Sequence, residues 1–247
     1  MDRFDGRTAL VTGGSRGIGR AICLRLAESG ARVAINYARD GTAAAAVRDH
    51  ITDAGGAAVT IQADVSDAGQ VEGMVKETVD SLGPVDLLVC NAGIGGQGAD
   101  LSHANWRAVQ SINVDGTFLP IMAVKDGMIA RQYGRIVCIA SIAGLRPRPN
   151  NVAYATSKAT VIAFVRNLAP VLAPHVRLNA VAPGLIETDM IVAMDQERRA
   201  RMIAETPLQR IGEPAEIAEM AHFLLSERSS YTTGQTLVAG GGRVTVP

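Results

Sequence analysis

The chain has 247 residues, in which 24 Lys and Arg residues balance 24 Asp and Glu residues. Hydrophobic residues make up 47% and charged residues 19%, an ordinary globular composition that excludes a disordered chain. The zero formal net charge and the pI near 6.9 argue against nucleic acid or an anionic membrane surface as the main partner.

The sequence lacks the patterns of a secreted, membrane-spanning or metal-binding protein. No stretch approaches about 18 uninterrupted apolar residues, and the opening residues MDRFDGRTALVTGG do not resemble a signal peptide. Three cysteines without CxxC spacing indicate neither a disulfide framework nor a zinc site. We therefore expect a cytoplasmic protein with no bound metal.

Two hydrophobic periods alternate along the chain. Short, β-branched apolar runs predict seven buried strands, at residues 8–12, 32–37, 59–62, 85–90, 135–140, 176–181 and 236–238. The stretches between them have helical spacing: Ile18, Ile22 and Leu26 recur every four residues before a stop at Gly30. Val71, Val75 and Val79 repeat that spacing, and the alanine-rich run 42–47 also predicts helix.

This alternation predicts an α/β fold. Strands joined by helices are parallel, and helices on both faces explain why the strands are apolar runs. No linker divides the chain, so we expect one doubly wound Rossmann-type domain over residues 1–247. The mixed-charge segment 185–212 predicts a helical insertion or flap at the carboxyl edge of the sheet. The end of a helix beginning at Val152 is expected to be interrupted by Pro170 and Pro174.

A glycine-rich turn follows the first predicted strand. Gly13, Gly17 and Gly19 have the spacing GxxxGxG, with Ser15, Arg16 and Ile18 between them. Glycines let the backbone approach a ligand closely, and the helix N-terminus offers unpaired N–H groups and partial positive charge to a pyrophosphate. The turn therefore predicts dinucleotide binding, although a purely structural strand–helix turn has the same pattern.

The end of the second strand indicates which dinucleotide is bound. An acid there usually accepts hydrogen bonds from the adenosine ribose, but the strand ends Asn36-Tyr37-Ala38-Arg39 and the first acid is Asp40. Arg16 and Arg39 could together bind a 2′-phosphate, so we predict NADP(H) rather than NAD(H). The alternative is that both are solvated surface arginines.

Three residues form a candidate catalytic group. Ser141 follows the fifth strand, at the sheet edge where such folds bind ligands, and Tyr154 and Lys158 share one helix face. A nearby ammonium is expected to lower the pKa of the tyrosine, whose ordinary value is near 10, and a serine hydroxyl can steady charge on a substrate oxygen. By itself, a Tyr–Lys pair at this spacing is also typical of surface neighbours.

Together these motifs resemble the short-chain dehydrogenase/reductase family, and within it the subgroup that includes 3-oxoacyl-[acyl-carrier-protein] reductases. The resemblance covers residues 6–243 and rests on TGGSRGIG (12–19), Asp64-Val65, Asn91-Ala92-Gly93, Asn113, Ser141, YATSK (154–158), Pro183-Gly184 and the glycines near the end of the chain. It implies a seven-stranded parallel sheet flanked by helices. It also implies a homotetramer, in which the helices around Asn113 and Tyr154 form one interface.

The resemblance implies a role for each matching residue. Tyr154 would be the general acid/base, Ser141 would polarise the carbonyl, and Lys158 would lower the tyrosine pKa and bind the nicotinamide ribose. Asn113 would sit in a kinked helix and hold a water for proton relay. The other expected cofactor contacts are Asp64 and Val65 at the adenine, Asn91, Ala92 and Gly93 along the cofactor, and Pro183, Gly184, Ile186 and Thr188 at the nicotinamide. Asn113 could instead cap or kink a helix, and Asp64 could form an Asx-type turn.

The leading hypothesis is therefore an NADPH-dependent ketoreductase acting on a 3-oxoacyl thioester of carrier protein or CoA. Of two expected basic docking sites for an acidic carrier, one retains Arg131, whereas the other reads Ala173-Pro174-His175. Arg146 and Arg148 could contact an acidic substrate or could be solvated loop charges. The alternatives are another ketone or secondary alcohol as substrate, a sugar or secondary metabolite, and, more remotely, a non-catalytic dinucleotide-binding protein.

Overall fold

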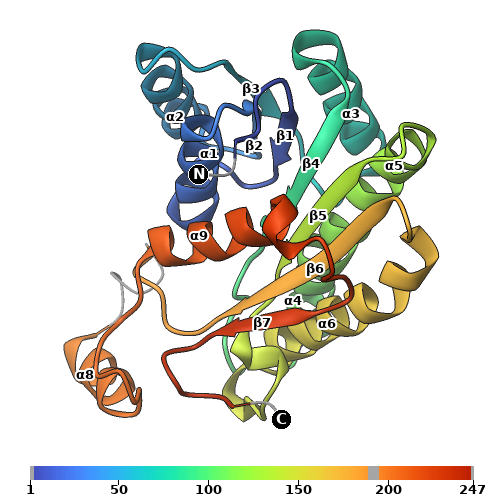
Figure 1. Ribbon diagram of the computed structural model, residues 1–247. Helices are drawn as coiled ribbons and strands as arrows, with labels where there is room; N and C mark the ends of the chain where they lie inside the picture. Colours follow the sequence, from blue (N-terminus) through green and yellow to red (C-terminus); the bar gives the residue numbers. More distant parts are fainter. Residues whose placement is uncertain (1–2, 189–194, 246–247) are drawn as a thin grey trace.

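The computed structural model describes residues 3–188 and 195–245. It contains one seven-stranded sheet, in which every neighbouring pair of strands is parallel and the order is β3-β2-β1-β4-β5-β6-β7. The strands are β1 (Thr8–Val11), β2 (Arg32–Tyr37), β3 (Ala58–Gln62), β4 (Val85–Cys90), β5 (Gly134–Ile139), β6 (Val176–Pro183) and β7 (Thr236–Ala239). The predicted doubly wound α/β fold is confirmed, and all seven expected strands are present (Figure 1).

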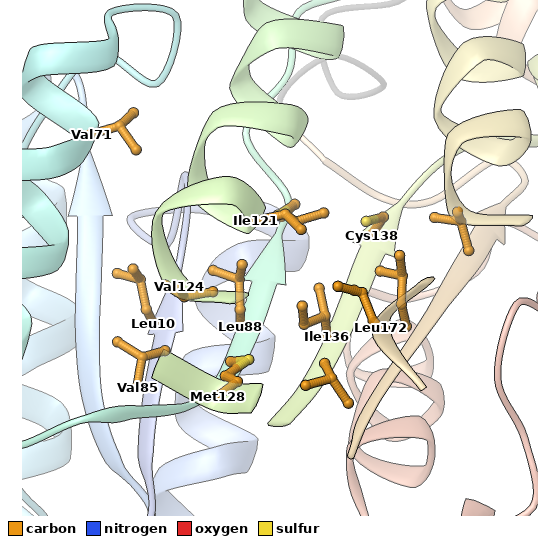
Figure 2. Close-up of a cluster of buried hydrophobic side chains, with 14 of the residues drawn as sticks. Leu10, Val71, Val85, Leu88, Ile121, Val124, Met128, Ile136, Cys138 and Leu172 are labelled. Atoms are coloured by element: carbon orange, nitrogen blue, oxygen red, sulfur yellow. The ribbon is translucent and has the colours of Figure 1, made fainter. Parts of the chain in front are cut away.

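Helices cover both faces of this sheet. The bounds are α1 (Gly17–Glu28), α2 (Gly41–Asp53), α3 (Ala68–Leu82), α4 (His103–Gln110), α5 (Gly116–Ala130), α6 (Val152–Leu172), α8 (Gln196–Ala204) and α9 (Pro214–Leu225). On one face α3, α5 and α6 pack over alternate strand residues such as Leu10 and Leu88, and Figure 2 shows this cluster. On the other face α1, α2 and α9 pack over the intervening residues, such as Val11 and Val89. Both faces are thus buried, which explains the apolar runs.

The helices differ from expectation in one place and agree with it in another. The buried stripe of α3 is Val71, Met74, Thr78 and Leu82, whereas Val79 is 42% exposed. A constant step of four residues overruns a turn of about 3.6 residues, so the predicted valine stripe drifts towards solvent. The two prolines lie at the end of α6 as expected: the helix passes Pro170 and ends at Leu172, before Pro174. A proline in the last turn removes a single backbone donor, a loss that the helix tolerates so close to its end.

The segment 185–212 contains the expected helix. Helix α8 has no buried residue and stands outside the two helix layers, near the ends of β6 and β7 (Figure 1). A β-bridge between Ile186 and Gly212 joins the two ends of this segment. Residues 189–194 of the expected flap lie outside the described residues. None of the described helices is long and apolar enough to cross a membrane.

Candidate active site

The glycine turn between β1 and α1 requires its glycines. Gly13 and Gly17 have φ values of +62° and +53°, a conformation that side chains disfavour. A Cβ atom at Gly19 would overlap the carbonyl oxygen of Gly13, and one at Gly13 would lie 3.0 Å from the Cα of Ala92. The turn is therefore packed backbone against backbone, and it leaves no room for larger residues.

Buried polar side chains hold this turn to the sheet. Asn91 donates from Nδ2 to the carbonyls of Thr12 and Gly13, both at 3.0 Å, and the Thr12 hydroxyl accepts from the N–H groups of Asn91 and Ala92. Asn36 accepts from the Gly13 N–H at 3.1 Å and donates to the carbonyl of Ala63 at 3.0 Å. Thr12 and Asn36 were not predicted as site residues. The sequence feature that could have identified them is a polar residue inside or at the end of an otherwise apolar strand.

The start of α1 suits an anionic ligand. Helices α2, α3, α4, α8 and α9 have side-chain caps on their first turns, whereas α1, like α5 and α6, has none. Within the described residues, the first N–H groups of α1 therefore have no side-chain partner, and the positive end of the helix dipole faces the glycine turn. Thr188 reaches the same place, since a Cβ at Gly17 would lie 3.4 Å from its methyl carbon. Glycine cradle and helix terminus together fit a pyrophosphate.

Beside the glycine turn, the end of β2 carries positive charge and a carboxylate that already caps a helix. Asp40, the first acid after β2, accepts from the Ala43 N–H at 2.9 Å and caps α2. Arg16 and Arg39 are exposed. Asp64 forms the Asx-type turn considered above, because its Oδ1 accepts from the Ser66 N–H and hydroxyl. Those two bonds, and more weakly Arg39, lower the pKa of Asp64.

Ser141, Tyr154 and Lys158 come together at the carboxyl end of β5. Ser141 lies just beyond Ile139, the last residue of that strand, and accepts from the Ala143 N–H at 3.1 Å, while Tyr154 and Lys158 come from the first turns of α6. The Lys158 ammonium lies 5.9 Å from the centre of the Tyr154 ring and donates to the carbonyl of Ile139 at 2.8 Å. The expected convergence of the three side chains is therefore present in the structure.

The electrostatics of this group differ from the expectation. Burial raises the pKa of Tyr154 above 10, and the influences that lower it are a hydrogen bond to Ser141 and the charge of Arg148. Burial also lowers the pKa of Lys158 from 10.5 to about 8. Lys158 is not among the groups that shift the tyrosine pKa here, and its ammonium donates to the Ile139 carbonyl.

Asn113 lies in a π-helical turn, Ser111–Asp115, between α4 and α5, a geometry that accounts for the expected kink. It is fully buried. Its amide donates to the Ile94 carbonyl at 3.0 Å and to the Ser157 hydroxyl at 2.9 Å, and its oxygen accepts from the Ile94 N–H at 2.8 Å. Ser157 in turn donates to the carbonyl of Tyr154. Asn113 therefore joins the loop after β4 to the helix of Tyr154.

The remaining predicted residues line the same edge of the sheet. A Cβ atom at Gly93 would lie 3.5 Å from the Lys158 ammonium, and one at Gly116 would press against Val65. Pro183 ends β6, and Gly184 packs so closely on Gly240 that a Cβ would lie 2.7 Å from its Cα. Ile186 is buried in the bridge to Gly212. Among the described residues, no group of His, Cys, Asp and Glu could hold a metal.

Comparison with known proteins agrees with this geometry. A family model described as enoyl-(acyl carrier protein) reductase matches residues 13–243. A 3-oxoacyl-[acyl-carrier-protein] reductase of Synechocystis sp. is 41% identical over 248 residues, covering 99% of both chains. The crystal structure of a 3-oxoacyl-[acyl-carrier protein] reductase from Brucella melitensis superposes with a TM-score of 0.91 at 35% identity, covering 98% of this chain and 92% of the other.

A second solved structure is similar but belongs to a differently named dehydrogenase. A 7α-hydroxysteroid dehydrogenase, in complex with NADH and 7-oxo glycochenodeoxycholic acid, superposes with a TM-score of 0.94 at 34% identity, covering 99% of this chain and 96% of the other. Likeness of this extent and coverage marks the protein as an oxidoreductase that acts on CH–OH groups with a nicotinamide dinucleotide. The chain belongs to the short-chain dehydrogenase/reductase family.

Proposed function

We propose that the protein reduces a ketone to a secondary alcohol with NADPH, and that a 3-oxoacyl thioester is its first substrate class. The observation that carries this proposal is the convergence of Ser141, Tyr154 and Lys158 at the edge of the sheet that also bears the glycine turn. The likeness to the 3-oxoacyl-[acyl-carrier-protein] reductases of Synechocystis and Brucella supports the thioester as substrate.

The proton chemistry follows from the pKa values. A nicotinamide dinucleotide whose pyrophosphate lies at the glycine turn would supply hydride. Because burial raises its pKa, Tyr154 keeps its proton at neutral pH and is poised to donate it to the substrate oxygen. Ser141 would hydrogen-bond the same oxygen. Lys158, with a pKa of about 8, can exchange protons near neutral pH and return one to Tyr154, while Asn113 holds the surrounding loop and helix in register.

The choice of NADP(H) rests on the ribose end of the cleft. Asp40 caps α2, so it is poorly placed to accept from the two hydroxyls of an adenosine ribose. Arg16 and Arg39 supply positive charge instead, and guanidinium groups match a 2′-phosphate in shape and charge. Asp64 and Val65 would border the adenine, and the loop of Asn91, Ala92 and Gly93 would run beneath the cofactor.

The assembly and partners belong to the same proposal. Exposed Phe118 on α5 packs on Phe164 of α6, with ring centroids 5.8 Å apart, at a cavity of about 300 Å³. This apolar helix pair supports a homotetramer of single-domain subunits. An acyl carrier protein is the expected thioester carrier, and the three cysteines, all buried and free, suit a cytoplasmic location.

The test is the initial rate of acetoacetyl-CoA reduction with NADPH and with NADH. We expect turnover with NADPH and a preference for NADPH that falls about tenfold in Arg39→Ala, since one charge-assisted contact is removed. Arg48→Ala, a change of the same kind at an exposed arginine of α2, is the control. No reduction by a protein that still binds NADPH would overturn the thioester assignment, and an unchanged preference in Arg39→Ala would overturn the 2′-phosphate assignment.

A further inference from the structure

Four arginines gather beside the reacting end of the site, and we call them the arginine cluster. Arg146 and Arg148 lie in the loop between Ser141 and Tyr154, Arg198 lies on α8, and Arg243 follows β7. The segments that carry Arg146 and Arg243 meet, since a Cβ at Gly240 would lie 3.1 Å from Ile142, and the charges of the four side chains act on one another. After burial, Arg146 and Arg198 lower the pKa of Arg148, and Arg146 and Arg148 lower that of Arg243.

The cluster is built into the fold. The side chain of Arg243 is 3% exposed, and it donates to the Met202 carbonyl at 3.1 Å and to Glu205 at 2.5 Å. The segment that carries it packs on the loop after Ser141, since a Cβ at Gly240 would lie 3.1 Å from the side chain of Ile142. The Nε atoms of Arg146 and Arg243 are both buried without a hydrogen-bond partner in the described residues, as are those of Arg32, Arg135 and Arg177 elsewhere in the fold.

The cluster lacks matching negative charge within the described part of the chain. There, Arg146 and Arg148 form no salt bridge, and the carboxylate that favours the charged form of Arg148 is Glu205, which already pairs with Arg243. Like charges gathered in a half-buried place disfavour one another, and a bound anion relieves that repulsion. Guanidinium groups bind carboxylate and phosphate through paired hydrogen bonds. The arrangement therefore favours the binding of an anion.

The position of the cluster limits where the anion sits on the substrate. Arg148 is near enough to Tyr154 for its charge to favour the ionised phenol. An anion held there is close to the carbonyl that Tyr154 protonates. In a phosphopantetheine thioester the phosphate lies at the far end of a long arm, away from the reacting carbonyl. A second feature agrees: Arg131, the retained basic docking residue, donates to the Val85 carbonyl at 2.7 Å and is drawn towards the protein.

We propose that Arg146 and Arg148, backed by Arg243, bind an anionic group, a carboxylate or a phosphate, that the substrate carries a short distance from its reacting carbonyl. This inference rests on the proposed ketone reduction and narrows its substrate class. Free oxo acids, acyl thioesters whose acyl chain ends in an acid, and phosphorylated ketones have this character. A thioester with a neutral acyl chain leaves the cluster unpaired.

The test compares ketones that differ only in charge. The pairs are acetoacetate with its ethyl ester, 4-oxopentanoate with its ethyl ester, and dihydroxyacetone phosphate with dihydroxyacetone. The first two pairs test whether a carboxylate is recognised, and the third pair tests a phosphate. For at least one pair we expect kcat/KM for the anion to exceed that for the neutral partner by about tenfold or more, as for one charge-assisted bond. In Arg146→Gln and Arg148→Gln this preference should disappear, mainly through KM.

Matched variants separate this role from a merely structural one. Arg48→Gln removes a charge of the same kind on α2 and should keep the preference for the anion. Arg148→Lys keeps the charge without the planar guanidinium group and should show part of that preference. Equal rates for anion and neutral partner in every pair would overturn the proposal, and so would a preference that persists in both glutamine variants.

A binding measurement separates the two proposals. Calorimetry with succinate and with inorganic phosphate should show binding to the wild type that is lost in Arg148→Gln. If these anions bind in this way but no ketone is reduced, the proposed function fails and the anion site stands. If acetoacetyl-CoA is reduced while neither anion binds and no pair shows a preference, the reductase stands and the anion site fails.

Discussion

The two ends of the site are built in opposite ways. The cofactor end, comprising the glycine turn with Asn36 and Asn91, is made of backbone groups and short buried amides that satisfy one another. The substrate end, comprising the loop after Ser141 and the arginine cluster, is made of long cationic side chains with little opposing charge among the described residues. One end is rigid and complete before any ligand arrives, and the other has charge left to pair.

This difference indicates what each end recognises. A turn formed by backbone tolerates one ligand shape, and it suits a cofactor common to a whole family. Long side chains on separate segments can be exchanged without disturbing the sheet, so they suit the part of the site that distinguishes substrates. Four variants test this comparison.

The largest effect is expected where the two ends meet. Tyr154→Phe removes the proton donor but keeps the ring, so kcat should fall by roughly 10²- to 10⁴-fold. Steady-state kinetics measure this loss. Fluorescence titration should show nearly unchanged NADPH affinity, because the cofactor end is complete without the phenol oxygen. Activity within a few-fold of the wild type would contradict the role of Tyr154.

The cofactor end should be intolerant of added atoms. Gly19→Ala puts a methyl group on the carbonyl of Gly13 and close to the Asn91 amide. We expect the free energy of unfolding to fall by about 3 kcal/mol, at the upper end of overpacking effects. The control is Gly73→Ala at an exposed position of α3, where a Cβ meets nothing within 4 Å. That change should stabilise by about 0.5–1 kcal/mol. Urea unfolding of both variants measures the contrast.

Lys158 should make stability depend on pH. Its pKa in the fold is about 8, below its ordinary 10.5, so the buried ammonium destabilises the fold. That cost is fully present below about pH 8 and disappears as the pH rises towards about 10.5, where the unfolded chain also loses the proton. Relative to Lys158→Met, the wild type should therefore gain stability over this window, by about 3 kcal/mol at most.

The check on Lys158 is urea unfolding of wild type and variant at about pH 7 and about pH 10. The variant removes the Ile139 bond at both pH values, so that loss cancels in the comparison. A difference between the two proteins that stays constant with pH would show that Lys158 keeps an ordinary pKa.

A smaller effect is expected from Asn36, which joins the glycine turn to β3. Asn36→Leu leaves the Gly13 N–H and the Ala63 carbonyl without their side-chain partner, at a cost of about 1–3 kcal/mol. The NADPH dissociation constant should also rise, because the turn loses its support. Gln62→Leu, which removes an exposed amide that donates to the Ala38 carbonyl, should cost less than about 0.5 kcal/mol. Equal losses of unfolding free energy in the two variants would contradict the role of Asn36 in supporting the glycine turn.

Local patterns predicted most of the fold. Seven apolar runs became seven strands, because a strand covered on both faces must be apolar along its length. The differences arose where burial, helix ends and hydrogen-bond partners depend on neighbouring elements. Val79 is exposed because the four-residue step carries it away from the buried face of α3, and α6 passes Pro170 because the helix ends soon after it. Asn36 and Thr12 were missed since their partners come from other strands.

The sequence by itself determined the strand–helix alternation, the glycine turn and the four-residue step from Tyr154 to Lys158. Each of these depends on residues a few positions apart, whose geometry follows from backbone conformation. Only the tertiary structure decided that Lys158 donates to Ile139, that Asn113 bonds Ile94 and Ser157, and that Arg243 donates to Met202 and Glu205. These contacts depend on packing between distant segments, and burial there sets charges and pKa values that no local pattern contains.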